Sequence, residues 1–181
     1  MIHTIPANGL AEIEAVTALF KEYADSLPVD LEYQGFSAEL QNLPGVYQPP
    51  TGALFIARVD GKEAGCVAVR RLDERTCEMK RLYVRPAHRG SGIGPLLVAK
   101  ALAAARTLGC DDIWLDTLAS MTAAHRLYLS MGFREIPSYG GDPAPGTRYL
   151  GLRVPPDPSF DADVPGMSDP LASRGGDAPI A

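Results

Sequence analysis

Hydrophobic and polar positions along the chain alternate between a helical period and a strand period. Apolar residues recur every three or four positions from Ile13 to Tyr23, which predicts an amphipathic helix that ends before Pro28. Residues 26–50 are irregular and rich in Gly and Pro, with a short helix expected within Phe36–Leu43. Three strand-like runs follow, at Ala53–Val59, Ala64–Leu72 and Glu78–Val84.

The second half of the chain continues this alternation. The apolar spacing from Leu97 to Leu108 predicts a helix that Gly109 terminates, and a further helix is expected between Ser120, as its N-cap, and Gly132. Further strands are expected at Ile113–Leu115, near Arg134–Ile136 and near Arg148–Val154. This order predicts an α/β (α+β) fold, a single domain with a central, mixed and mostly antiparallel sheet flanked by helices.

Composition separates a domain from a tail. The length of 181 residues fits one domain, which we place at residues 1–154. Residues 155–181 contain six Pro and five Asp but few apolar residues, so we expect this tail to be disordered.

Charge is distributed unevenly, although the formal net charge is only −5. Residues 1–57 contain seven acidic residues and one basic residue, whereas residues 58–106 contain eleven basic and five acidic residues. A net-acidic chain argues against general nucleic-acid binding. The gradient indicates an anionic ligand beside the basic segment and a cationic one beside the acidic segment, or else scattered surface charge.

Localisation and cysteine chemistry are constrained by what the sequence lacks. The first residues show no secretory signal, and no window reaches the roughly 18 apolar residues of a membrane span. We therefore expect a cytoplasmic protein with no membrane partner. Cys66, Cys77 and Cys110 show no CxxC spacing, which indicates buried reduced thiols rather than a disulfide framework or zinc. The three histidines show no metal-binding spacing either, so we expect no metal.

The segment from Met79 to Gly94 is the most informative part of the chain. A strand leads into a loop with glycines at 90, 92 and 94, and a helix begins there. Free amides at a helix start, together with glycines, form a site suited to phosphate. Pro95 excludes GxGxxG, and no Gly-Lys-Ser/Thr completes a P-loop. Taken without further context, the glycines also fit an ordinary turn.

Two motifs favour a phosphate-binding role for the glycine loop over an ordinary turn. Arg89-x-x-Gly92-x-Gly94 resembles the pyrophosphate-binding signature of the GNAT superfamily of acyl-CoA-dependent N-acetyltransferases, and Lys80–Pro86 resembles the strand that precedes it. Ala124–Phe133 is similar to the family's Ala-x-x-Leu-Tyr-x-x-x-Gly-Phe element. The two motifs occur in the family's order, and the resemblance covers about residues 1–154.

The resemblance implies acetyl-CoA as co-substrate. It assigns the pyrophosphate to the amides from Arg89 to Gly94, and the pantetheine arm to the main chain of the strand before them. The implied cofactor-binding residues are Leu82, Tyr83, Val84, Arg89, Gly90, Ser91, Gly92, Ile93 and Gly94.

Some residues around these motifs support the assignment of family roles to this chain, and others limit it. Met79 and Leu82 have opposite parity along the strand, which predicts a β-bulge between them. Arg85 and Arg126 fit either phosphate contacts or solvated surface charges. Where many family members have Asn, this chain has Met121, so that cofactor contact is not carried over.

The resemblance also implies catalytic roles. Tyr128 matches a tyrosine near the thioester sulfur, where it would serve as general acid or stabilise the thiolate. In reference values, protonation of a thiolate by a phenol is uphill by roughly 2 kcal/mol. Glu78 matches a family carboxylate that acts as a base. From position alone, Tyr128 also fits a core residue, and Glu78 fits a surface ion pair.

The acceptor is expected to be a primary amine of a small molecule. We place its pocket between the irregular region, with Tyr33, and the late loop around Tyr139; Asp30 and Glu32 are acidic residues that would attract an amine. A protein or peptide N-acetyltransferase and a non-catalytic acyl-CoA-binding regulatory module are the alternatives. A monomer or a homodimer is expected.

Overall fold

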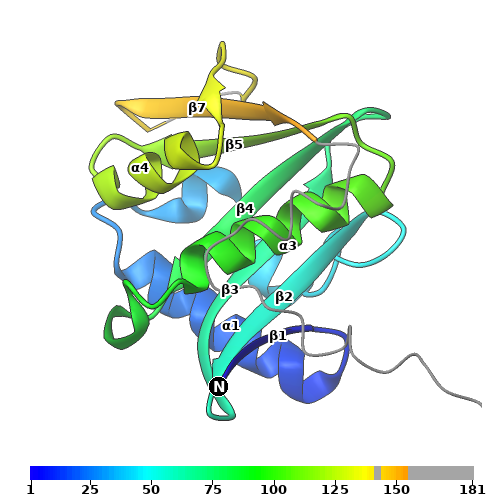
Figure 1. The fold of residues 1–181 in the computed structure, drawn as a ribbon, viewed down its shortest axis with the longest axis vertical. Helices are drawn as coiled ribbons and strands as arrows, with labels where there is room; N and C mark the ends of the chain where they lie inside the picture. Colours follow the sequence, from blue (N-terminus) through cyan, green and yellow to red (C-terminus); the bar gives the residue numbers. More distant parts are fainter. Residues whose placement is uncertain (141–143, 155–181) are drawn as a thin grey trace, which may run out of the picture.

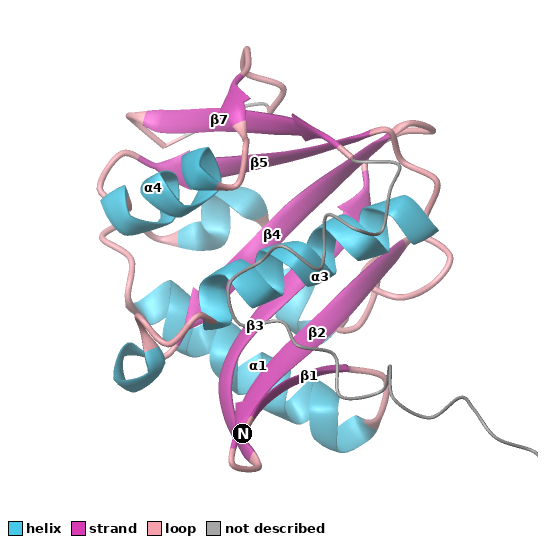
Figure 2. Cartoon of the chain, in the orientation of Figure 1, coloured by secondary structure: helices cyan, strands magenta, loops and turns pink. Residues whose placement is uncertain are grey.

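The computed structural model describes residues 1–140 and 144–154. Its strands form one seven-stranded sheet in the order β1-β2-β3-β4-β5-β7-β6 (Figures 1 and 2). The strands are β1 (Ile2–Pro6), β2 (Gly52–Val59), β3 (Lys62–Arg71), β4 (Thr76–Val84), β5 (Asp112–Leu118), β6 (Arg134–Glu135) and β7 (Thr147–Arg153). Neighbouring strands are antiparallel except β4 and β5, which are parallel. The mixed, mostly antiparallel sheet is thus confirmed.

Helices cover both faces of this sheet. The α-helices are α1 (Leu10–Asp25), α2 (Phe36–Gln41), α3 (Ile93–Thr107) and α4 (Thr122–Ser130), and two short 3-10 helices are η1 (Leu31–Gln34) and η2 (Pro86–His88). In Figure 1, α3 lies in front of the sheet and α1 lies behind it. The sheet is therefore a middle layer between two helical layers.

Strand β3 shows how the sequence creates two cores. Side chains alternate across a strand, so consecutive apolar residues are buried on opposite faces. Val67 and Val69 pack into the core beneath α3, whereas Cys66 and Ala68 pack into the core beneath α1. An unbroken apolar run in this strand is consequently the signature of a sheet that is covered on both sides.

The sequence prediction omits one strand and misplaces one helix cap. Strand β1 was not predicted, because it is an edge strand with mostly exposed side chains that pairs with β2 on one side alone. Ser120 does not cap the fourth helix. That helix begins at Thr122, Met121 stands at the N-cap position, and no side-chain hydrogen bond caps it.

The cysteine prediction holds for one thiol and fails for two. Cys66 is free and buried, and its burial raises the pKa of the thiol. Cys77 and Cys110, in contrast, form a disulfide, with their Cα atoms 5.9 Å apart. Cys77 lies at the start of β4 and Cys110 just before β5, and these two strands run parallel from that end. The two cysteines are close because the chain returns through α3 to place β5 parallel to β4, and the spacing of the cysteines in the sequence does not reveal this.

The proposed tail lies outside the described residues, as does residue range 141–143 of the late loop. The domain boundary at residue 154 likewise stays a prediction. Among the described residues, none of the helices has the length and apolar character needed to span a bilayer.

Candidate active site

The site forms where β4 separates from β5. The two strands pair only over Thr76–Glu78 and Asp112–Trp114. Beyond Glu78, the edge of β4 that faces β5 has no partner strand in the described chain. An unpaired edge leaves backbone donors and acceptors available to a ligand.

A β-bulge lies in this unpaired part of β4. The register with β3 shifts between Cys66 and Ala68, and Arg81 has a φ of +56°, which is rare for a residue other than glycine. Because of the bulge, Lys80 and Arg81 both reach the same side of the sheet and contact the Gln34 side chain. The bulge predicted from strand parity is confirmed.

Arg81 anchors the wall of the site to this bulge. Its side chain is 3% exposed, and its guanidinium forms two hydrogen bonds, of 3.1 and 2.6 Å, with the carboxylate of Glu39 on α2. It also donates to Gln34 Oε1 at 2.9 Å and lies over the ring of Phe36, 5.2 Å from its centroid. One side chain thereby fixes η1 and α2 against β4.

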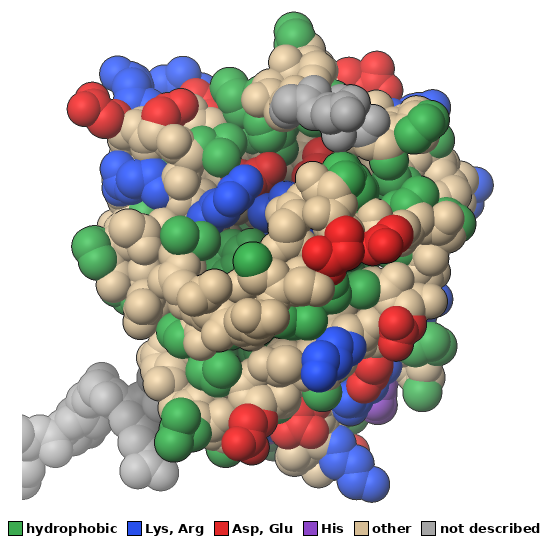
Figure 3. All heavy atoms as spheres, turned by 180° about the vertical axis from the view of Figure 1, so that it is seen from behind, with side chains coloured by type: hydrophobic (Ala, Val, Ile, Leu, Met, Phe, Trp, Pro, Cys, Tyr) green, Lys and Arg blue, Asp and Glu red, His purple; other side chains and the backbone are tan. Residues whose placement is uncertain are grey.

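Two cavities meet beside this anchor, on the sheet face opposite α3. The larger has a volume of about 560 Å³ and lies between α2, the sheet and the late loop. Figure 3 shows a hollow on this face with charged side chains of both signs. The smaller cavity, of about 30 Å³, lies at the separation of β4 from β5. Both cavities are lined by Tyr33, Gln34, Lys80 and Asp116.

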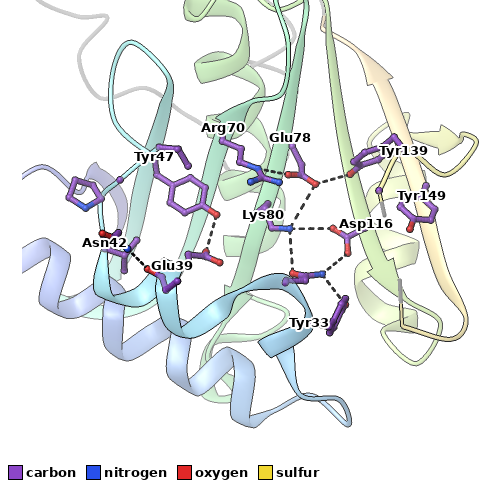
Figure 4. A pocket seen from close by; sticks show the side chains of 17 residues that line it. Tyr33, Glu39, Asn42, Tyr47, Arg70, Glu78, Lys80, Asp116, Tyr139 and Tyr149 are labelled. Carbon is purple, nitrogen blue, oxygen red and sulfur yellow. Dashed lines mark hydrogen bonds and ion pairs between the residues drawn. The ribbon is translucent and has the colours of Figure 1, made fainter. Parts of the chain in front are cut away.

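Charged side chains from three strands line the larger cavity (Figure 4). Arg70 Nε donates to Glu78 Oε2 at 2.6 Å, and Lys80 Nζ lies 3.8 Å from both Glu78 Oε1 and Asp116 Oδ1. Tyr139 donates its hydroxyl to Glu78 Oε1 at 3.1 Å. Burial, and next the Glu78 charge, raise the pKa of Tyr139, so this phenol is neutral and serves as a donor.

The predicted acceptor residues are only partly those that the structure brings together. Tyr33 and Tyr139 both line the larger cavity. Asp30 and Glu32 do not, because Asp30 caps η1 and Glu32 accepts hydrogen bonds from Ser37. The carboxylates that do line it are Glu39, Glu78 and Asp116. Arg70, Lys80 and Asp116 are not among the predicted site residues, because each lies on a different strand and only the folded sheet brings them together.

Tyr128 lines the smaller cavity rather than the larger one. Its side chain is 5% exposed and packs against the Phe133 ring, yet its hydroxyl has no hydrogen-bond partner among the described residues. Burial raises the pKa of this phenol well above its usual range. This hydroxyl is not among the fully buried polar atoms without a partner in the described residues, so it is accessible from the cavity and available to a ligand group there.

The glycine loop offers free amides at the start of α3. Gly90 and Gly92 have φ values of +79° and +87°, and no atom lies within 4 Å of where a side chain would begin at Gly90. The amides from Gly90 to Gly92 donate to no other backbone group of the described chain. The first amides of α3 likewise lack intrahelical acceptors. This cradle fits an anion such as a pyrophosphate.

Several candidates near the loop have other contacts. The Arg89 amide donates to the Pro86 carbonyl at 3.2 Å, so it is not among the free amides. Arg85 forms two hydrogen bonds, of 2.9 and 2.7 Å, with Glu22 of α1, and these bonds lower the pKa of the Glu22 carboxyl. Its guanidinium is therefore already paired with a carboxylate. The Tyr83 side chain is buried in the core beneath α1, which leaves only its main chain for a ligand. Arg126 is exposed on α4.

No group of three or more His, Cys, Asp or Glu side chains that could hold a metal ion occurs within residues 1–140 and 144–154.

Comparison with known proteins gives consistent matches. The family model "Acetyltransferase (GNAT) family" matches residues 16–133. An uncharacterized N-acetyltransferase of Schizosaccharomyces pombe is 38% identical over 145 residues, which covers 79% of this chain and 89% of that protein. The N-acetylaspartate synthetase of Danio rerio is 34% identical over 100 residues, which covers 54% of this chain and 36% of that protein.

Solved structures show the same architecture. An acetyltransferase of Salmonella typhimurium, solved with acetyl-CoA, superposes with a TM-score of 0.63 at 20% identity. The superposition covers 86% of this chain and 95% of that one. At this level of identity the likeness concerns the fold.

Proposed function

We propose that the acceptor of this enzyme is a small molecule. The chain belongs to the GNAT family of acetyltransferases and is an acetyl-CoA-dependent N-acetyltransferase. The observation that carries the proposal is the 560 Å³ cavity with its charged lining, which adjoins the smaller cavity at Tyr128. Pockets for small ligands have volumes of about 300–1,000 Å³. The N-acetylaspartate synthetase among the relatives is named for a small-molecule product, which supports the same class of acceptor.

The glycine loop and the free edge of β4 are the proposed binding site of acetyl-CoA. The amides from Gly90 to Gly94 would hold its pyrophosphate, and the main chain from Leu82 to Val84 would hold its pantetheine arm. The open cradle at Gly90, the unpaired strand edge and the unpartnered Tyr128 hydroxyl support this fit. When bound, acetyl-CoA supplies an acetyl thioester whose C–S bond breaks as the acceptor amine forms the new N–C bond.

Tyr128 is proposed to donate its hydroxyl to the thiolate that is released. The raised pKa of the phenol keeps it protonated at neutral pH, so it is a permanent donor. The same raised pKa makes full proton transfer to a thiolate less favourable. We therefore assign Tyr128 mainly to stabilisation of the negative charge on sulfur by a hydrogen bond, with protonation following from solvent.

Glu78 is proposed to accept the proton that the amine must lose. Its carboxylate is 4% exposed and lines the larger cavity, where Arg70, Lys80 and Tyr139 orient it. Asp116 is a second carboxylate in reach of the acceptor, because it lines both cavities. The two carboxylates stand on adjacent strands with Lys80 between them, so their variants can be compared directly.

Cytoplasmic location and a monomeric or homodimeric state stay predictions from the sequence.

The acceptor class can be tested by thiol release from acetyl-CoA, measured with small amines, amino acids, aminoglycosides and peptides. We expect saturable release with at least one small amine or amino acid. Release with peptides alone would contradict the small-molecule assignment. Saturable acetyl-CoA binding without release by any acceptor would instead indicate a non-catalytic regulatory module.

Tyr128→Phe tests the proposed donor. Because the hydroxyl acts only on charge that develops during transfer, kcat should fall by about 10²-fold while the Kd for acetyl-CoA changes less than about twofold. The pH dependence of kcat should keep its shape, since the raised pKa means that this phenol does not titrate near neutrality. Tyr83→Phe is the matched control, because the buried Tyr83 side chain lines neither cavity and the change leaves the main chain proposed to bind the pantetheine arm intact. An unchanged kcat in Tyr128→Phe would refute the role.

Glu78→Gln tests the proposed base against Asp116→Asn. Loss of the proton acceptor should lower kcat/KM by about 10²-fold and remove its rise with pH on the acidic side. Asp116→Asn should keep that rise. A Glu78→Gln enzyme with the pH profile of the unmodified protein would dismiss Glu78, and loss of the rise in Asp116→Asn alone would assign the base to Asp116.

A further inference from the structure

Arg70 has donors that the fold does not use. It lies on β3 directly opposite Glu78 of β4, and its Nε donates to that carboxylate. Its two outer nitrogens, Nη1 and Nη2, have no hydrogen-bond partner in the described parts of the chain. The side chain is 38% exposed and lines the larger cavity, where Figure 4 shows it beside Glu78. The unused nitrogens are therefore accessible from the cavity.

Glu39 and Lys80, two other charged residues of the cavity, are already paired within the protein. The carboxylate of Glu39 is held by the buried Arg81 guanidinium and by the Tyr47 hydroxyl at 2.9 Å. Lys80 is 9% exposed and is surrounded by Glu78, Asp116 and Gln34. Arg70 is thus the accessible cation of the cavity with free donors, judged over the residues described.

The positions of the charges favour an acceptor with two charged ends. Arg70 lies on β3 and Asp116 on β5, with β4 between them. Adjacent paired strands are about 4.8 Å apart, and Asp116 lies beyond the segment in which β4 and β5 pair, so the two backbones are separated by more than two such spacings. Asp116 also lies at the boundary with the smaller cavity, which is the end where the amine would react. An anionic group on the same molecule would then face Arg70.

We propose that the acceptor amine carries a carboxylate, and that Arg70 binds this carboxylate through Nη1 and Nη2. Arg70 is therefore a specificity-determining residue, and the acceptor class is an amino acid or an ω-amino acid. The guanidinium fork matches the two oxygens of a carboxylate, which a lysine at this place would not. This inference rests on the proposed small-molecule function and narrows it.

The test uses matched pairs of acceptors in the thiol-release assay with the full chain. L-Aspartate, L-glutamate, β-alanine and 4-aminobutyrate are each compared with the same amine in which the carboxylates are carboxamides. For at least one pair, we expect kcat/KM of the unmodified protein to favour the acid by about 10- to 100-fold, as a charged hydrogen-bonded pair allows. In Arg70→Met, this preference should fall to within about twofold.

The acid-to-carboxamide ratio separates recognition from general damage. Loss of Arg70 also removes a partner of Glu78, which lowers the rate with both members of a pair, but the ratio cancels this effect. Arg70→Lys keeps the positive charge near Glu78, and its acid-to-carboxamide ratio should lie between those of the unmodified protein and Arg70→Met. This variant provides the test if Arg70→Met folds poorly. Arg71→Met is the matched control, because Arg71 is next in the strand and donates instead to the Glu74 and Leu108 carbonyls. Its ratio should equal that of the unmodified protein.

The outcomes distinguish this inference from the function on which it rests. Equal rates with acids and carboxamides would overturn the carboxylate proposal and leave the small-molecule function intact. A preference for acids that persists in Arg70→Met and Arg70→Lys would overturn the assignment to Arg70. Thiol release with no small amine of any kind would overturn both.

Discussion

The buried ion pair between Arg81 and Glu39 is the interaction on which the site depends. Arg81 occupies the bulge of β4 with a positive φ, and its guanidinium is held by α2 and η1 rather than by solvent. A strained backbone conformation persists when the surrounding structure specifies it. Here the same pair joins the bulge of β4 to α2, which lines the larger cavity.

The bulge also determines which side chains reach which layer. Before it, Glu78 and Lys80 face the larger cavity; after it, Leu82 and Val84 pack against the core beneath α3. A regular strand would have kept one parity throughout and could not have presented Lys80 and Arg81 to Gln34 together. The divergence of β4 from β5 then leaves a strand edge free next to Tyr128, and the larger cavity lies immediately beside it. The proposed cofactor and acceptor sites would be neighbours because one local irregularity produces both the free strand edge and the adjoining cavity.

Features that depend on one segment of the chain can be predicted from the sequence. Features that depend on the parallel connection from β4 through α3 to β5 cannot. Helix and strand periods, the glycine loop and the bulge follow from spacing within one segment, and the structure shows all of them. The charged lining of the cavity comes from β3, β4 and β5, so Arg70 and Asp116 become neighbours of Glu78 only after the sheet has formed. The pairing of Cys77 with Cys110 depends on the same parallel crossover. Arg85 shows the same limit, because the sequence leaves its role open and its partner Glu22 lies far away in the sequence on α1.

The most direct measurement is a double-mutant cycle on Arg81 and Glu39, read as the free energy of unfolding of Arg81→Met, Glu39→Gln and the double variant. Removal of one partner leaves a buried charge unpaired, so Arg81→Met alone should lower this free energy by about 3–5 kcal/mol. The double variant should be more stable than the sum of the single effects predicts, by at least about 1 kcal/mol. Arg148→Met provides a baseline, since that arginine pairs with the exposed Glu135 and should change stability by less than about 1 kcal/mol. Additive effects, or an Arg81→Met variant no less stable than Arg148→Met, would contradict the account.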